Sequence, residues 1–262
     1  MTVTAWSITQ NGRYEPFELQ VSRGQISWHE TVFQFGINNA VGTSFETIWT
    51  ASSVYSYLAS ASVLKISSGS ADDASAGTGA RTVRIEGLDG SYNEISETVT
   101  LNGQTAVNTV NSYLRVSSLI VLTAGSGGVN AGILYAGTGT VTSGVPQNVY
   151  AQVEVGYCKS AMAIWTVPAG YTAYVTSYTF TSNSSTANNQ ITGAVIIRPL
   201  GGVFSFEATA KMAGGNGFDR HFDTYLVVQE KSDIQMQVLA SAAAQVTGEL
   251  QIIYIKNDAG TA

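Results

Sequence analysis

The stretch G-T-G-A-R-T-V-R-I-E-G-L-D-G-S-Y-N-E-I-S-E-T-V-T-L-N-G, residues 77–103, shows most clearly what kind of fold this chain forms. Apolar residues share one face of each of two runs within it, namely Val83 and Ile85, then Ile95, Val99 and Leu101. This alternation is typical of half-buried strands, and Asp89-Gly90 is typical of a turn between them. With a two-residue loop, Ile85 would pair with Glu94 and Arg84 with Ile95, so apolar and charged residues would share a face. The pattern therefore predicts a β-hairpin with a longer, odd-length loop in which Gly90 takes a positive φ.

The composition beyond this hairpin is that of a β-rich protein with a neutral surface. Charged residues make up only 11% of the 262 residues, against about 25% in an average soluble domain. The net charge is −6 and the isoelectric point is about 4.8. Because phosphate neutralisation needs clustered lysine and arginine, and no such run is present, we expect no direct nucleic-acid partner.

Short alternating runs separated by turn residues fill the rest of the chain, and no pattern predicts a helix longer than two turns. The composition shifts near residues 156–161, and a fresh series of strand patterns follows at 175–181, 194–198, 203–209, 222–228, 234–239 and 250–255. We predict an all-β protein made of two antiparallel β-sandwich or jelly-roll-like units. The predicted parts are an N-terminal segment or arm at 1–42 that packs on domain 1 or on a neighbour, a β-sandwich domain at 43–157, and a second sandwich or jelly-roll domain at 158–262.

The sequence also indicates where the chain is made. Cys158 is the only cysteine, which excludes an internal disulfide framework. No apolar run approaches the ~20 residues of a membrane-spanning helix. The N-terminus lacks a basic segment followed by an apolar core, so it does not match a secretory signal. We expect synthesis in a cytoplasm and no membrane partner.

Residues that could carry chemistry are sparse. Asp219, His221 and Asp223 alternate along one run, so on a strand they would share a face, and we name them as weak metal candidates beside the simpler interpretation of a solvated face. Asp72-Asp73 lies in a small-residue loop but lacks the ordered carboxylate spacing of a calcium loop. No nucleophile elbow, phosphate-binding loop or paired-histidine zinc motif is present. We therefore predict no catalytic residues, no metal and no cofactor, and a protein that is not an enzyme.

Large aromatic residues cluster in the first forty or so positions. They supply more apolar area than such short strand patterns need, and exposed apolar area of this kind usually marks an interface. The candidate interface residues are Trp6, Phe17, Trp28, Phe33 and Phe35.

Several longer stretches resemble a group of tailed-bacteriophage virion proteins that is common in marine phages. The resemblance rests on P-F-E-L-Q-V-S-R-G-Q-I at 16–26, F-G-I-N-N-A-V-G-T-S-F-E-T-I-W at 35–49, the hairpin stretch at 77–103, W-T-V-P-A-G-Y-T at 165–172 and E-K-S-D-I at 230–234. It covers nearly the whole chain. It implies a structural component of the particle and supplies no catalytic residues.

Composition and resemblance together predict a rigid building block of the virion, assembled in the host bacterial cytoplasm. We favour a capsid decoration or cement protein that binds the major capsid protein or other virion proteins. A neck or tail component and a receptor- or glycan-binding fibre module are the alternatives. Few charges and exposed strand edges favour a closed homo-oligomer, and the three-fold positions of an icosahedral shell favour a homotrimer.

Overall fold

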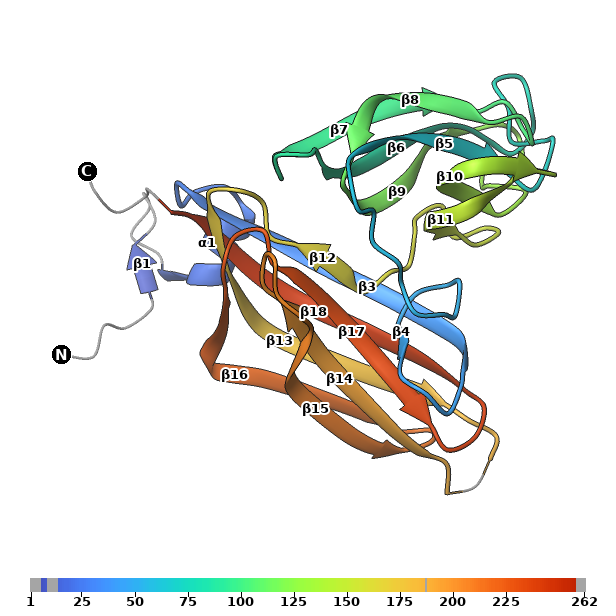
Figure 1. Ribbon diagram of the computed structural model, residues 1–262. Helices are drawn as coiled ribbons and strands as arrows, with labels where there is room; N and C mark the ends of the chain where they lie inside the picture. Colours follow the sequence, from blue (N-terminus) through green and yellow to red (C-terminus); the bar gives the residue numbers. More distant parts are fainter. Residues whose placement is uncertain (1–5, 9–13, 187, 258–262) are drawn as a thin grey trace.

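The computed structural model describes residues 6–8, 14–186 and 188–257 and confirms the all-β fold. Two β-sandwiches lie one above the other in Figure 1. The lower one contains strands from both ends of the chain, and the upper one is formed by the residues between them. We call them the jelly-roll sandwich and the inserted sandwich, for reasons that follow from the strand order.

The jelly-roll sandwich consists of two facing sheets. One contains, in spatial order, β16 (Gly217–Val228), β13 (Tyr171–Asn183), β18 (Ala244–Lys256) and β3 (His29–Val41). The other contains β15 (Ser205–Ala213), β14 (Gln190–Arg198) and β17 (Asp233–Ala240), with β4 (Glu46–Thr47) and β12 (Ile164–Thr166) both pairing with β17.

The strand order in these two sheets is that of a jelly roll. In chain order, the eight strands β3, β4 and β13 to β18 are divided between the sheets so that each sheet has four of them. The first strand, β3, pairs antiparallel with the last, β18, and the second, β4, pairs with the second to last, β17. Nested pairing of this kind is how a double-sheet jelly roll is wound.

The period-two pattern of these strands places their apolar residues between the two sheets. Val175, Tyr178 and Phe180 of β13 belong to one fully buried cluster with Met236 of β17 and Leu250 of β18. Burying each such side chain contributes roughly 1.5–3 kcal/mol, so this cluster is the main source of stability for the jelly-roll sandwich.

The inserted sandwich has its own two sheets and its own buried core. Its larger sheet contains, in spatial order, β11 (Val145–Val153), β10 (Leu134–Thr142), β5 (Ser62–Ser68) and β8 (Val107–Tyr113). The smaller sheet contains β7 (Glu94–Thr100), β6 (Ala80–Leu88) and β9 (Arg115–Ala124). Leu64, Ile66, Ile85, Leu119 and Leu134 lie fully buried between them.

The hairpin at 77–103 forms β6 and β7, and its loop has the predicted odd length. Leu88 pairs with Glu94, which leaves the five residues 89–93 as the loop. The positive φ, however, is at Tyr92 and not at Gly90, so that prediction was wrong. The reason is local: the Asp89 carboxylate accepts the backbone N–H groups of Ser91 and Asn93, which turns the chain before Tyr92.

The N-terminal segment differs from the prediction of an arm on domain 1 or on a neighbour. β3 pairs with β18 over almost its whole length, so residues 29–41 are an integral strand of the C-terminal sandwich. The short ribbon of β1 (Trp6–Ile8) and β2 (Tyr14–Pro16) and the six-residue helix α1 (Phe17–Ser22) precede it. A unit at 158–262 alone would therefore lack β3 and β4, because jelly-roll closure needs strands from both ends of the chain.

Gly36 of β3 allows the two segments that connect the sandwiches to pass close over this strand. The segment leaving β4 and the segment entering β12 run side by side, with the Ala163 N–H donating to the Ile48 carbonyl at 2.9 Å. Both segments pass directly over β3. A Cβ at Gly36 would lie 2.2 Å from the Ile48 oxygen and 2.4 Å from the Ala163 nitrogen, so only glycine fits.

We predict that Gly36→Ala destabilises the protein by about 1–3 kcal/mol, because backbone atoms must move to admit the methyl group. Chemical denaturation monitored by circular dichroism measures the change. Gly69→Ala is the matched control, since a Cβ there meets nothing closer than 3.8 Å. Equal stability of the two variants would contradict the close packing of the connecting segments on β3.

Candidate functional site

The junction between the two sandwiches is built around one buried carboxylate, Asp233 at the start of β17. Its neighbours Ile234 and Met236 point into the jelly-roll core, so strand alternation turns Asp233 and Gln235 toward the inserted sandwich. Arg115 of β9 donates to Asp233 from Nε to Oδ1 at 2.7 Å and from Nη2 to Oδ2 at 3.2 Å. This bidentate pair joins one sandwich directly to the other.

Two further groups from the jelly-roll sandwich complete this site. Arg198 of β14 donates to Asp233 Oδ2 from Nε at 3.0 Å and from Nη2 at 2.5 Å. The Thr166 hydroxyl donates to Oδ1 at 2.6 Å. The Asp233 side chain is only 3% exposed, so a carboxylate removed from water here is compensated by two guanidinium groups.

The Tyr57 ring lies against both arginines and orders them. The guanidinium carbon of Arg115 lies 4.9 Å from the ring centroid, and that of Arg198 lies 4.5 Å from it. The Tyr57 hydroxyl accepts a hydrogen bond from Gln235 Nε2 at 3.2 Å. Burial raises the pKa of the Tyr57 phenol, with the nearby Asp233 charge adding to the effect, so the ring stays neutral beside the two cations.

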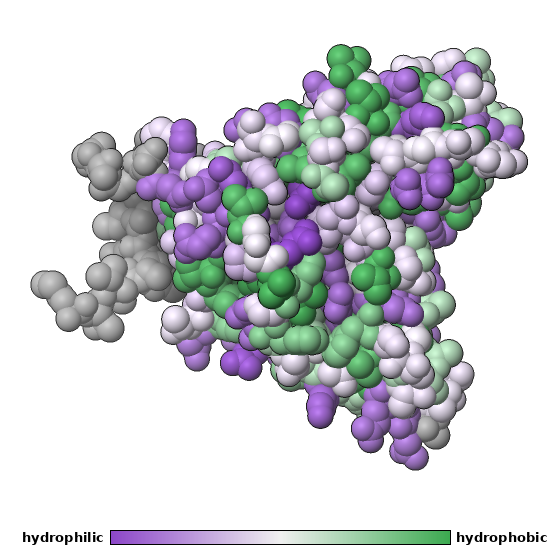
Figure 2. Space-filling model, viewed as in Figure 1, coloured by the Kyte–Doolittle hydropathy of each residue, from purple (hydrophilic) through white to green (hydrophobic). Residues whose placement is uncertain are grey.

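Asp233, both arginines and Tyr57 line an open recess of about 440 Å³ between the sandwiches, together with Tyr92 and Lys231. Figure 2 shows strongly hydrophilic atoms in the hollow between the two bodies, bordered by hydrophobic surface. Three exposed apolar residues lie at or just after the 198–202 segment that lines the recess, namely Leu200, Val203 and Phe206.

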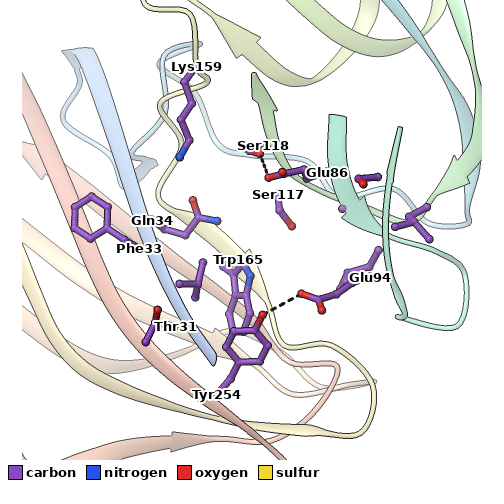
Figure 3. A pocket seen from close by; sticks show the side chains of 15 residues that line it. Thr31, Phe33, Gln34, Glu86, Glu94, Ser117, Ser118, Lys159, Trp165 and Tyr254 are labelled. Carbon is purple, nitrogen blue, oxygen red and sulfur yellow. Dashed lines mark hydrogen bonds between the residues drawn. The ribbon is translucent and has the colours of Figure 1, made fainter. Parts of the chain in front are cut away.

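A second hollow, which we call the cleft, has a volume of about 380 Å³ and is also walled by both sandwiches. Its jelly-roll wall contains Phe33 and Gln34 of β3, Trp165 of β12 and Tyr254 of β18, and its inserted-sandwich wall contains Glu86, Glu94, Ser96, Ser117 and Ser118. Figure 3 shows Gln34, Trp165 and Tyr254 on the side of β3 that faces Glu94 and Ser117, with Lys159 reaching in from the connecting segment, whereas the Phe33 ring lies on the other side of β3. Lys159 is anchored by a backbone bridge to Ile120 of β9.

Two buried polar groups in the cleft have no partner among the described residues. The Gln34 side chain is only 7% exposed, and its amide makes no hydrogen bond within the described part of the chain. Trp165 is only 5% exposed, and its indole N–H is likewise without a described acceptor. Figure 3 shows the Gln34 amide directed across the cleft toward Ser117. The polar atoms of both side chains are open to the cleft, so the cleft has unused hydrogen-bonding capacity.

The carboxylates of the cleft are held by different partners. Glu86 receives the Ser118 hydroxyl at 2.6 Å and pairs with Arg84 Nε at 2.7 Å. The Tyr254 hydroxyl lies 2.7 Å from Glu30 Oε2 and 3.3 Å from Glu94 Oε1. Burial raises the pKa of the Tyr254 phenol, so it stays protonated and donates. Partial burial, with the charges of Glu30 and Glu86, raises the pKa of the Glu94 carboxyl.

The groups that line this junction are suited to binding a polar ligand. Its two hollows offer amide, hydroxyl, ammonium and guanidinium donors together with carboxylate acceptors and aromatic rings. The Arg115–Asp233 ion pair joins β9 of one sandwich to β17 of the other and holds the two walls at one separation. The Arg198–Asp233 pair joins β14 to β17 within the jelly-roll sandwich.

The structure does not assemble the weak metal candidates. His221 Nε2 lies 3.3 Å from Asp219 Oδ2, and both side chains are more than half exposed. Asp223 is separated from them because β16 bulges between the pairs Ser177–His221 and Val175–Leu226. Among the described residues, no group of three or more His, Cys, Asp or Glu side chains is placed to hold a metal ion.

Asp73 is a structural residue of the inserted sandwich. Its buried carboxylate accepts hydrogen bonds from the Ser68 hydroxyl and from the backbone N–H groups of Ala80, Ala131 and Gly132, at 2.6–2.8 Å. Its acceptor positions are therefore occupied by donors of the surrounding turns, which it holds together.

The aromatic interface candidates occupy different environments. Trp28 is 55% exposed and lies under the Lys256 ammonium at 5.0 Å, and Phe33 is 50% exposed on the face of β3 opposite Gln34. Phe17 and Phe35 are half-buried, the first with its ring edge-on to His29 at 5.6 Å. The side chain of Trp6 lies outside the described residues.

Asp233, Arg115 and Gln34 were not predicted as site residues. Asp233 belongs to the turn-like stretch E-K-S-D-I, and nothing local distinguishes it from a solvated acid. Arg115 is the charged residue of an otherwise apolar and hydroxyl-bearing run, L-R-V-S-S-L-I, and a charge at a strand position of that kind is the signal that could have identified it.

Comparison with known proteins gives limited information. No protein-family model matches the chain, and no curated protein is significantly similar to it. One similar solved structure is the VP2 subviral particle of infectious bursal disease virus, with 12% identity over 90% of this chain and 74% of that chain and a TM-score of 0.24. The Gx strain of the same virus has 10% identity over 89% and 73% and a TM-score of 0.25. Because both TM-scores are low, neither likeness supports a statement about this chain.

None of the helices among the described residues is long and apolar enough to cross a membrane.

We predict that Asp233→Asn destabilises the protein by about 3–5 kcal/mol, because it leaves the buried Arg115 and the partly buried Arg198 without their counter-charge. Urea denaturation of the purified protein measures the loss. Asp223→Asn, an exposed position on β16, is the matched control and is expected to change stability by less than about 0.5 kcal/mol. Similar values for the two variants would show that the ion network does not hold the junction.

We predict that Glu94→Gln makes the melting temperature less sensitive to pH. Because the folded-state pKa of Glu94 is raised, its stabilising contribution is present below the ordinary carboxyl pKa and is lost as pH rises through the raised value. The variant should therefore gain in melting temperature relative to the natural protein at pH 7, and gain less at about pH 4. Glu18→Gln on α1 is the control for removing one exposed charge. A larger relative gain in acid would contradict the assignment.

Proposed function

We propose that this chain is a virion structural protein of a tailed bacteriophage. The observation that carries the proposal is the eight-stranded jelly roll closed by the pairing of β3 with β18, because this architecture recurs in viral capsid domains. The sequence resemblance at 16–26, 35–49 and 77–103 supports the same assignment from a different direction.

Within the virion, we favour the role of a capsid decoration protein that adds buried area between neighbouring capsid proteins. The rigid junction at Asp233 and the low charge of the surface both suit a building block. Exposed apolar residues such as Trp28 and Val203 offer contact area for protein partners. The chain would act without a cofactor, without enzymatic activity and without direct contact to nucleic acid or membrane, and would assemble in the host bacterial cytoplasm.

The proposed assembly is a homotrimer. Three copies on a three-fold position of an icosahedral shell would each make the same contacts, and linked weak contacts gain from effective concentration. The outer strands β15 and β16, with mostly exposed residues, leave sheet edges that a closed ring would cover.

Copy number separates decoration from the alternatives. Quantitative mass spectrometry of purified virions, scaled to the major capsid protein, is expected to give on the order of hundreds of copies per particle for a decoration protein that follows icosahedral symmetry. A dozen or fewer would assign the chain to the neck, tail or a fibre, and complete absence from virions would overturn the structural role. Light scattering of the isolated protein should give three times the 27.6 kDa chain mass, and a monomer mass would remove the trimer.

A further inference from the structure

We propose that the cleft between the two sandwiches binds a neutral carbohydrate, recognised through Gln34, Trp165 and the serine hydroxyls. This binding site goes beyond the structural role and does not depend on the number of copies in a particle.

The first step is the unused hydrogen-bonding capacity of the jelly-roll wall. The Gln34 amide offers two donors and an acceptor, and the Trp165 indole offers one donor. Both side chains are more than nine-tenths buried, both line the cleft, and neither has a hydrogen-bond partner among the described residues. Water reaches both groups through the cleft, so a ligand that replaces this water gains about 0.5–1.5 kcal/mol net for each hydrogen bond.

The second step is the opposite wall, which is rich in hydroxyl groups. Ser96 and Ser117 line the cleft, and neither hydroxyl has a partner within the described part of the chain. Each serine can donate and accept at once, as each sugar hydroxyl does. A ligand with several hydroxyl groups therefore matches both walls, whereas an apolar ligand would leave both walls unpaired.

The third step is the size of the cleft. A volume of about 380 Å³ lies within the size range of small-molecule sites.

The fourth step is charge, which favours a neutral ligand. Glu86 and Glu94 line the cleft, with Glu30 next to Tyr254, against the single ammonium of Lys159; Arg84 compensates Glu86. An anionic sugar would be repelled by the uncompensated carboxylates, whereas the hydroxyl groups of a neutral sugar can donate hydrogen bonds to them.

The test is a titration of the full chain with a panel of short neutral oligosaccharides, built from glucose, mannose, galactose or N-acetylglucosamine. Calorimetry gives the affinity, and the 1H–15N NMR signal of the Trp165 indole, assigned with Trp165→Phe, reports the site. We expect at least one member to bind with a millimolar or lower dissociation constant and to shift that signal. Failure of every member to bind overturns the proposal, as does binding only to an oligogalacturonate included as the acidic arm.

Two variants locate the binding. Gln34→Met and Ser117→Ala are each expected to weaken binding about ten-fold, since each removes hydrogen bonding of roughly 1.4 kcal/mol. Ser112→Ala is the matched control, at an exposed serine of β8 that does not line the cleft. Melting curves check that each variant is folded, and Ser117→Ala, at a half-buried position, provides the decisive result if Gln34→Met is unstable. Equal affinity of Ser117→Ala and Ser112→Ala would place the sugar elsewhere and overturn the assignment.

Discussion

The buried contact between Asp233 and two arginines is the interaction on which the relation of the two sandwiches depends. A carboxylate that is 3% exposed is stable only while its hydrogen bonds are complete, and here they come from Arg115 on one sandwich and from Arg198 and Thr166 on the other. Hydrophobic packing alone is tolerant of small sliding motions. Directional, charge-assisted hydrogen bonds are not, and they give the junction one geometry.

The jelly-roll topology places this ion-pair network next to the connections between the two sandwiches. Because β3 pairs with β18 and β4 with β17, the chain enters the inserted sandwich from the middle of the larger fold and returns to the same place. The two connecting segments bond to each other above Gly36, so the entry and exit are held together. The inserted sandwich is thus fixed at two points, by its connecting segments and by Arg115.

A fixed junction is what allows the cleft to be a site. Its walls come from different sandwiches, and groups such as Gln34 and Ser117 face each other only because the two bodies keep one orientation. A structural role in a particle and recognition of a carbohydrate both require this rigidity, in the first case for repeated contacts and in the second for a preorganised set of hydrogen-bonding groups. The two proposals therefore rest on one physical property and remain separate in their tests.

The sequence by itself determined the fold class and the hairpin of β6 and β7, but not the helix α1, whose residues alternate like those of a strand. Alternation at Val83, Ile85 and Val99 specified a hairpin with an odd-length loop, because side-chain period and pairing register are local consequences of strand geometry. Only the tertiary structure decided which strands pair across long separations, since β3 and β18 carry apolar patterns that would suit many partners. The same holds for the site: Asp233 and Gln34 look like ordinary polar residues along the chain. Asp233 acquires its role by burial against Arg115, more than a hundred residues away, and Gln34 by its position in the cleft between the sandwiches. No local sequence pattern records such contacts.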